Sequence, residues 1–225
     1  MRIKADLHVH TNYSFDSFNS LDQLIAKAAE NGIGAVAVTD HNTIEGALRL
    51  REATPPFKVI VGQEVHSDCG EISGLFLKER IINWMSPRET CLAIKEQGGL
   101  VYLPHPLARI TPSRIKPNQI PGIMDLVDIV EVANARNPLY RDDVRAEKLA
   151  DRHGKLKGAG SDAHLPGELF RTHMEMLAFD TPEEFMEGLA SARLVADRKS
   201  SFFITCTIAL ATLPYFLLRI YGRRK

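Results

Sequence analysis

The chain has 225 residues, and its 28 basic residues balance its 28 acidic ones, so the formal net charge is zero. This length allows one domain with a sizeable buried core. The neutral balance argues against a basic surface for DNA or RNA, and we expect no stable nucleic-acid partner. The three cysteines lack the spacing of a disulfide framework, which favours a reducing compartment: Cys69, Cys91 and Cys206.

The first ten residues alternate between apolar and polar side chains, which is the period of a β-strand. At this period His8 and His10 lie on one face, where two imidazoles can bind one metal ion. Asp6 points the same way and is a candidate acceptor for a hydrogen bond from a ligand. The His-x-His spacing alone is a weak metal signal, because a polar edge strand with two unrelated histidines has the same pattern.

Further along, helical patterns alternate with short apolar runs that are typical of buried strands. Caps, prolines and glycines predict helices over 20–32, 43–53, 86–98, 140–153 and 181–192. The apolar runs predict strands over 35–38, 59–61, 72–77, 100–103, 129–130 and 157–160. A proline-rich loop runs from 104 to about 121. This alternation predicts an α/β protein with parallel strands.

Polar residues that can bind metal ions stand at or just past the ends of these strands. Parallel strands place their C-terminal ends on one side, and in a barrel these ends converge on the face that carries active sites. Imidazoles and carboxylates are the ligands of hydrolytic metal sites. His66, His153 and His173 lie outside the set, which consists of Asp6, His8, His10, Asp40, His41, Glu64, His105, Glu131, Asp162 and His164.

Six motifs follow one another along residues 3 to about 179: Asp6-x-His8-x-His10-Thr11, Thr39-Asp40-His41, Gly62-x-Glu64, His105-Pro106, Glu131 with Asn134, and Gly160-Ser-Asp-Ala-His164. In this order they resemble the PHP (polymerase and histidinol phosphatase) superfamily. The resemblance implies a distorted (β/α)7 barrel with two or three divalent metal ions at the C-terminal ends of its strands. No polymerase modules flank the motifs, so the chain is most similar to the small stand-alone phosphoesterases, with residues 1–198 as the phosphoesterase domain.

The resemblance also implies a role for each matching residue. The first ion would be held by His8, His10, Glu64 and Asp162. Glu64 would bridge to a second ion that His105 also binds, and Glu131 occupies a further ligand position, where some family members use histidine. A third ion would be bound by Asp16, His41 and His164. Asp40 is assigned to catalysis as the group that orients a neighbouring ligand. Relatives often carry Gly-His-Ile where this chain has Gly70-Glu71-Ile72, a difference expected to affect the pocket wall and not the metal core.

This ligand set determines the expected chemistry. Imidazole and carboxylate ligands suit manganese, iron or zinc. Two ions about 3.5–4 Å apart lower the pKa of a shared water, so that hydroxide can attack phosphorus near neutral pH. The sequence shows no side-chain nucleophile motif and no phosphate-binding glycine-rich loop. We therefore predict a phosphoesterase acting on a small phosphorylated metabolite or nucleotide, with Arg136 and Arg171 binding phosphate.

Two other functions stay open at this point. A 3′–5′ exonuclease on single-stranded DNA or RNA could use the same ions, although neutral charge and the lack of a basic, aromatic groove count against it. A non-catalytic metal-binding module is the other alternative, and the intact ligand set counts against that. For Arg136 and Arg171 the alternative is a surface arginine that pairs with an acidic residue.

The C-terminal segment 199–225 has a different composition from the rest of the chain. Residues 202–218 contain no charge over 17 positions, and a basic end follows, Arg223-Arg224-Lys225. This is the short limit of a membrane-spanning helix. We interpret the segment as a membrane anchor tethering a cytoplasmic domain, because the chain begins without a signal peptide. A helix docked on the barrel and a helix lying in the membrane interface are the alternatives.

The anchor interpretation predicts that the full-length protein sediments with membranes and needs detergent for release. A chain ending at Arg198 should instead stay in the supernatant, because it lacks the apolar run. Cell fractionation with immunoblotting measures both. Equal solubility of the two chains without detergent would show that the tail belongs to the barrel.

Overall fold

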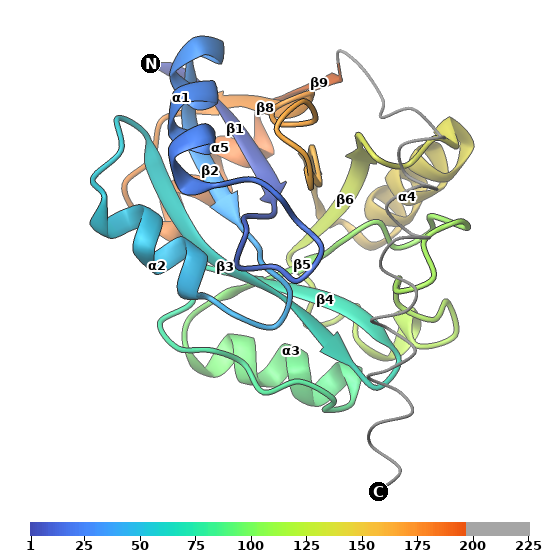
Figure 1. Cartoon of the computed structure of the whole chain (residues 1–225). Coiled ribbons are helices and arrows are strands. Elements are labelled where there is room, and N and C mark those ends of the chain that lie inside the picture. The colour runs from blue at the N-terminus through green and yellow to red at the C-terminus, as the bar shows by residue number, and fades with distance from the viewer. Residues whose placement is uncertain (197–225) are drawn as a thin grey trace, which may run out of the picture.

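The computed structural model describes residues 1–196, which form helices around a nine-stranded sheet (Figure 1). The strands are β1 (Arg2–Val9), β2 (Ile33–Val38), β3 (Lys58–Ser67), β4 (Gly70–Leu75), β5 (Leu100–Leu103), β6 (Ile129–Asn134), β7 (Leu156–Gly160), β8 (Thr172–Leu177) and β9 (Arg193–Ala196). The helices are α1 (Leu21–Asn31), α2 (Glu45–Glu52), α3 (Pro87–Glu96), α4 (Tyr140–His153), α5 (Pro182–Ala190) and the 3₁₀ helix η1 (Ile120–Gly122).

Local sequence signals place three helix starts where the sequence predicts them. The side chains of Ser20 and Ser86 accept a hydrogen bond from the backbone N–H three residues on. Gln23 and Glu89 in turn accept a bond from the N–H of the capping residue. Thr181 caps α5 with its hydroxyl. These bonds satisfy N–H groups that have no partner within the helix, which fixes where each helix begins.

The strands curl into a nearly closed, barrel-like sheet with the order β7-β6-β5-β4-β3-β2-β1-β8-β9. β1, β2 and β3 are parallel, and so are β5, β6 and β7, whereas β4 runs antiparallel between β3 and β5. The end of β1 also meets the segment after β7. There the N–H of Asp162 donates to the carbonyl of His8 at 2.7 Å, and Val9 bridges to Ala163. The predicted α/β barrel fold is confirmed.

Three regions depart from a regular alternation of strands and helices. β3 runs past the predicted end at residue 61 to Ser67 and forms a hairpin with β4. The proline-rich segment between β5 and β6 contains η1 and no α-helix. β8 and β9 pair antiparallel beside β1, where the sequence predicts no strand. The hairpin matters most for the site, because its strands carry Glu64, His66 and Glu71.

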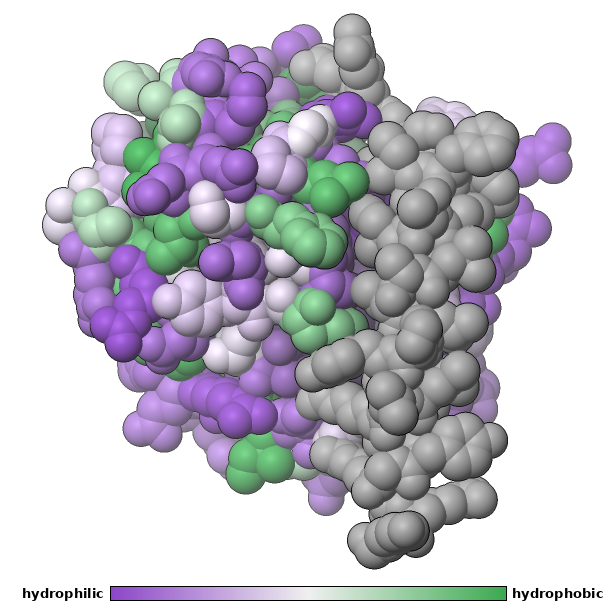
Figure 2. Space-filling view, in the orientation of Figure 1, coloured by the Kyte–Doolittle hydropathy of each residue, from purple (hydrophilic) through white to green (hydrophobic). Residues whose placement is uncertain are grey.

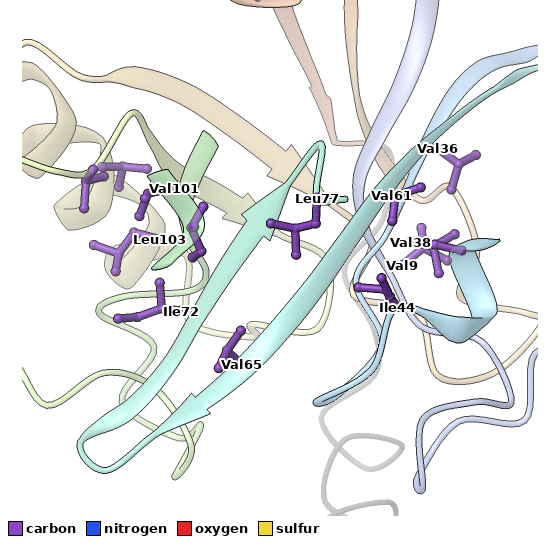
Figure 3. Packing of buried hydrophobic residues seen from close by; sticks show 14 of the residues in the cluster. Val9, Val36, Val38, Ile44, Val61, Val65, Ile72, Leu77, Val101 and Leu103 are labelled. Carbon is purple, nitrogen blue, oxygen red and sulfur yellow. The ribbon is translucent and has the colours of Figure 1, made fainter. Parts of the chain in front are cut away.

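Alternation along the strands separates apolar from polar side chains. Val36 and Val38 of β2 pack in the apolar cluster that includes residues of the surrounding helices (Figure 3). Val130 and Val132 of β6 belong to the same cluster. Glu131 lies between these two valines, so its side chain points to the opposite face, toward the barrel interior. The apolar positions thus direct the polar strand-end residues inward.

The predicted anchor cannot be compared with this fold, because residues 202–218 lie outside the described part of the chain. Within residues 1–196, no helix is long and apolar enough to cross a membrane. On the face drawn in Figure 2, hydrophilic and hydrophobic residues are interspersed over the coloured part of the surface. The anchor therefore stays a prediction from the sequence.

Close backbone packing at Gly160 closes the sheet. A Cβ at this position would lie 2.3 Å from the Cβ of His8 and 2.7 Å from its backbone nitrogen. Neither atom can give way easily, because both belong to a buried residue in the middle of the sheet. Glycine therefore lets the end of β7 contact β1 directly beside His8.

We predict that Gly160→Ala lowers the free energy of unfolding by about 1–3 kcal/mol, the usual cost of overpacking, and displaces His8. Thermal denaturation and metal analysis of the purified variant measure these effects. Gly122→Ala is the matched control, because a Cβ at Gly122 meets nothing within 4 Å. Unchanged stability and metal content in Gly160→Ala would contradict the packing argument.

Candidate metal centre

Four side chains point their ligand atoms at one position near the ends of β1, β3 and β7. Nε2 of His8 lies 3.0 Å from Nε2 of His10. Each of these nitrogens lies 3.3–3.6 Å from a carboxylate oxygen of Glu64 and from Oδ1 of Asp162. Tetrahedral ligands about 2.1 Å from an ion stand about 3.4 Å from one another. His8, His10 and Asp162 thus form one group that could hold an ion, and Glu64 joins His8 and His105 in another.

Hydrogen bonds on the far side of the rings determine which nitrogen faces the site. Nδ1 of His8 lies 3.1 Å from Oε1 of Glu131, a carboxylate that accepts, so His8 donates from Nδ1. The hydroxyl of Ser14 donates to Asp40 at 2.8 Å, so its oxygen accepts from Nδ1 of His10 at 3.0 Å. In the neutral rings both Nε2 atoms then carry an unprotonated lone pair, and the two lone pairs face each other. Either a bound cation or a proton relieves this arrangement, and Glu64 and Asp162 favour the proton by raising the pKa of both rings against the effect of burial.

Glu131 lies behind the ligands rather than among them. Its Oε1 accepts from His8 and from the hydroxyl of Tyr102 at 3.0 Å. Its Oε2 accepts from the backbone N–H of His105 at 2.6 Å and from the amide of Asn134 at 3.0 Å. Four donors on two oxygens are the pattern of a residue that orients a ligand. The geometry supports this role for Glu131 in place of the ion ligand that the sequence predicts.

Asp40 likewise acts at a distance from the ion position. Besides Ser14, its carboxylate accepts the backbone N–H of Thr11 at 2.7 Å and the hydroxyl of Thr11 at 2.6 Å. Asp40 thus orients His10 through Ser14, which supports the predicted role in positioning a neighbouring ligand. Asp6 instead accepts the backbone N–H groups of His8 and Ser161, at 3.2 and 2.9 Å, and so joins β1 to the end of β7.

His105 faces Glu64 from another side of the cluster. Its Nε2 lies 3.1 Å from Oε1 of Glu64, which is also 3.5 Å from Nε2 of His8. The other oxygen of Glu64, Oε2, lies 3.3 Å from Nε2 of His10, so the two carboxylate oxygens face different imidazoles. His105 and Asp162 have positive φ angles of 28° and 51°. Strain of this kind at non-glycine residues costs about 1–3 kcal/mol and is typical of functional sites.

The three residues predicted to bind a third ion also come together. Oδ2 of Asp16 lies 3.5 Å from Nε2 of His41 and 3.2 Å from Nε2 of His164. The ligand nitrogens of His10, His41 and His164 form a further group that could hold an ion. His10 thus belongs to this group and also to the group that it forms with His8 and Asp162.

Burial and mutual attraction shift the pKa values of these groups. Burial by itself lowers the pKa of His41 and His105, but nearby carboxylates outweigh it and raise these pKa values to about 10 and about 9. Burial raises the pKa of Glu64 and Asp162, yet the adjacent imidazoles hold both pKa values well below the usual range. The carboxylates are thus ionised, and without an ion the rings of His41 and His105 take up protons to balance them.

Of the two predicted phosphate-binding arginines, the structure brings Arg136 to the cluster. Its Nη1 lies 2.8 Å from Nδ1 of His164 and 3.8 Å from Oδ1 of Asp162. Arg171 donates from Nε to the carbonyl of Gly167 at 2.8 Å and makes no ion pair with the cluster within residues 1–196. Phosphate binding by Arg171 therefore stays a prediction.

Two residues that the sequence analysis places outside the metal core lie against it. Glu71 of β4 is buried, with Oε1 3.5 Å from Nδ1 of His41 and Oε2 3.7 Å from Nε2 of His105. His66 of β3 lies beside Glu71, with Nε2 3.1 Å from Oε1. Residue 66 follows Glu64 at the two-residue period of a strand. A prediction of β3 to its full length would therefore have placed His66 on the same face as Glu64.

Metal binding should depend on pH in a defined direction. Ions must displace protons from imidazoles whose pKa values are about 10 at His41 and about 9 at His105, so affinity increases as the pH rises toward this range. Binding near neutral pH should therefore release protons. Calorimetric titration with Mn²⁺ in buffers of different protonation enthalpy measures this release. Equal affinities at about pH 6 and about pH 8 would contradict the assignment.

Comparison with known proteins gives matches in sequence. A family model described as the PHP domain matches residues 6–178. Protein MJ0417 of Methanocaldococcus jannaschii is 29% identical over 197 residues, which cover 83% of this chain and 79% of that protein. Protein MJ1587 of the same organism is 42% identical over 120 residues, 48% of this chain and 70% of that protein. An error-prone DNA polymerase of Symbiobacterium thermophilum is 52% identical over 46 residues, 20% of this chain and 4% of the polymerase.

Solved structures share the fold. A two-domain protein from Bacteroides vulgatus, described as containing a predicted PHP-like metal-dependent phosphoesterase, superposes with a TM-score of 0.72 and 18% identity over 87% of this chain and 65% of that chain. A lesion-specific endonuclease from Pyrococcus furiosus gives a TM-score of 0.64 and 17% identity over 86% of this chain and 58% of that chain. This chain thus spans about two thirds or less of these two proteins. Since the PHP model matches most of its sequence, the chain belongs to the PHP domain family.

Proposed function

We propose that this protein is a metal-dependent phosphoesterase that hydrolyses an ester of a small phosphorylated metabolite or nucleotide, using two or three divalent ions of manganese, iron or zinc. The observation that carries the proposal is the pair of Nε2 atoms of His8 and His10, 3.0 Å apart and flanked by ionised Glu64 and Asp162. Their other nitrogens are engaged, so this pair is prepared to share a cation.

The chain's own residues hold and orient the reacting groups. Divalent ions, when bound, lower the pKa of a coordinated water and withdraw charge from phosphoryl oxygens. The histidines and carboxylates of the cluster fix where those ions bind, and Glu131 and Ser14 prevent the rings of His8 and His10 from turning. Such preorganisation keeps the electrostatic stabilisation in place before the substrate arrives.

Arg136 supports the choice of a phosphate ester. Its guanidinium lies next to Asp162 and His164 and is mostly buried, with 14% of the side chain exposed. The side chain of Asn134 accepts the backbone N–H of Arg136 at 2.9 Å and donates to Glu131 and Asp162. The arginine is thus attached to the ligand framework. A guanidinium so placed can donate two charge-assisted hydrogen bonds to phosphoryl oxygens.

The proposal predicts that His105→Ala and Asp162→Asn each lower kcat by about 100-fold or more on p-nitrophenyl phosphate with added Mn²⁺. Losing a positioned ion removes several kcal/mol of transition-state stabilisation. Circular dichroism checks that the variants stay folded. His153→Ala is the matched control, because His153 is exposed at the end of α4 and should retain wild-type turnover. Near wild-type turnover in either site variant would contradict the mechanism.

The same assay distinguishes the other functions when it includes nucleotides, phosphorylated metabolites and single-stranded DNA. Hydrolysis of small esters without shortening of DNA is the result we expect. Shortening of DNA without action on small esters would identify an exonuclease. Tight metal binding with no hydrolysis of any substrate would identify a non-catalytic module.

A further inference from the structure

The hairpin formed by β3 and β4 brings two ionisable side chains together beside the metal centre. His66 pairs with Glu71 across the hairpin, and Glu64 pairs with Ser73 two residues along. Residues opposite each other in an antiparallel pair project to the same face, as do residues two apart in one strand. Glu64, His66 and Glu71 therefore share the face that meets His105.

The carboxylate of Glu71 is buried without the hydrogen bonds that such a group needs. Only 1% of the side chain is exposed, and neither oxygen accepts a hydrogen bond from a backbone or amide group. Its nearest ionisable neighbours are imidazole nitrogens, Nε2 of His66 at 3.1 Å, Nδ1 of His41 at 3.5 Å and Nε2 of His105 at 3.7 Å. A buried carboxylate in this state is unfavourable unless a cation compensates it.

The backbone around Glu71 is held by the proline-rich loop. The N–H of Glu71 donates to the carbonyl of Ser113 at 2.9 Å. Gly70 has a φ of +119°, and a Cβ there would lie 2.4 Å from the carbonyl oxygen of Arg114. Only glycine permits this approach, so the loop and β4 fix the direction in which Glu71 enters the cluster.

Asn42 determines the proton position on His66. Its Oδ1 accepts the backbone N–H of His66 at 2.9 Å, which turns its Nδ2 toward Nδ1 of the ring at 3.0 Å. An amide nitrogen can only donate, so Nδ1 accepts and the neutral ring carries its proton on Nε2. That Nε2 is the atom nearest to Glu71. His66 is thus suited to hold Glu71 by one oxygen and leave the other oxygen to an ion.

We infer that Glu71 is a ligand, through Oε2, of the divalent ion that Glu64 and His105 bind, and that His66 is the positioning residue of this carboxylate. The inference rests on the metal centre of the proposed function but not on its substrate. Nε2 of His105 lies between the two carboxylates, 3.1 Å from Glu64 and 3.7 Å from Glu71. A second carboxylate adds negative charge and favours ions that prefer oxygen ligands, such as Mn²⁺.

The test is the Mn²⁺ content of full-length protein from Mn²⁺-supplemented cultures, measured by elemental analysis after dialysis. Glu71→Gln keeps the shape of the side chain but loses its charge, and we expect one bound ion fewer per chain than in wild type. His66→Ala should weaken retention of that ion by about 10–100-fold, the usual effect of losing an orienting partner. His66→Gln keeps an N–H donor and should restore retention, which a purely structural role of His66 would not predict.

A crystal structure of the wild type with anomalous data at the manganese edge locates the ions directly. An anomalous peak in contact with Glu71, Glu64 and His105 is expected. Wild-type Mn²⁺ content in Glu71→Gln, or peaks that leave Glu71 uncontacted, would overturn the inference while leaving the proposed function intact. Wild-type protein that binds no Mn²⁺ would overturn both. Bound ions at Glu71 without hydrolysis of any ester would support the inference and contradict the proposed function.

Discussion

The contact between Nε2 of His8 and Nε2 of His10, inside a ring of buried carboxylates, is the constraint on which the structure depends. Burying ionised groups is unfavourable unless each is paired, and two imidazole nitrogens 3.0 Å apart need a proton or a cation between them. A barrel of parallel strands is one of few frameworks that can support this, because strand ends from distant parts of the chain meet there. Divalent cations are the partners that relieve both costs at once.

The order within the cluster comes from residues that touch no ion position. Glu131 accepts a hydrogen bond from Nδ1 of His8, on the side of the ring away from the site. Ser14 does the same for His10, and its own hydroxyl donates to Asp40. A carboxylate at a strand end is therefore not sufficient to identify a ligand. What distinguishes Glu131 from Glu64 is the kind of group around it. Glu64 faces imidazole nitrogens, whereas Glu131 also accepts from a hydroxyl, an amide and a backbone N–H. The donors to Glu131 come from β1, β5 and β6 together with the loop that follows β5.

Sequence reasoning locates most of the site because the period of the strands and their apolar ends are local properties. His8, His10, Glu64, His105 and Asp162 converge as predicted, since each follows an apolar run that the barrel must bury. Hairpin pairing is not local in the same way. The apolar run of β3 ends at Val61, so nothing in composition shows that the strand continues to Ser67 or that β4 returns beside it. The family resemblance places Glu71 in the pocket wall, whereas the hairpin brings it against His41 and His105.

Barrel closure and metal binding use the same residues, which couples stability to the site. Asp6 joins the backbone of His8 to that of Ser161, and the N–H of Asp162 donates to the carbonyl of His8. Burial raises the pKa of Asp6 to about 7, although its hydrogen bonds to Ser161 and His8 oppose this shift. Because the raised pKa favours the protonated form, ionising Asp6 is unfavourable in the fold, and its contribution to stability falls as the pH rises from about 4 through 7. An ion bound by His8 and Asp162 connects the same two strand ends that Asp6 joins. Occupancy of the metal site should therefore stabilise the closed barrel most at the higher pH values, where Asp6 contributes least.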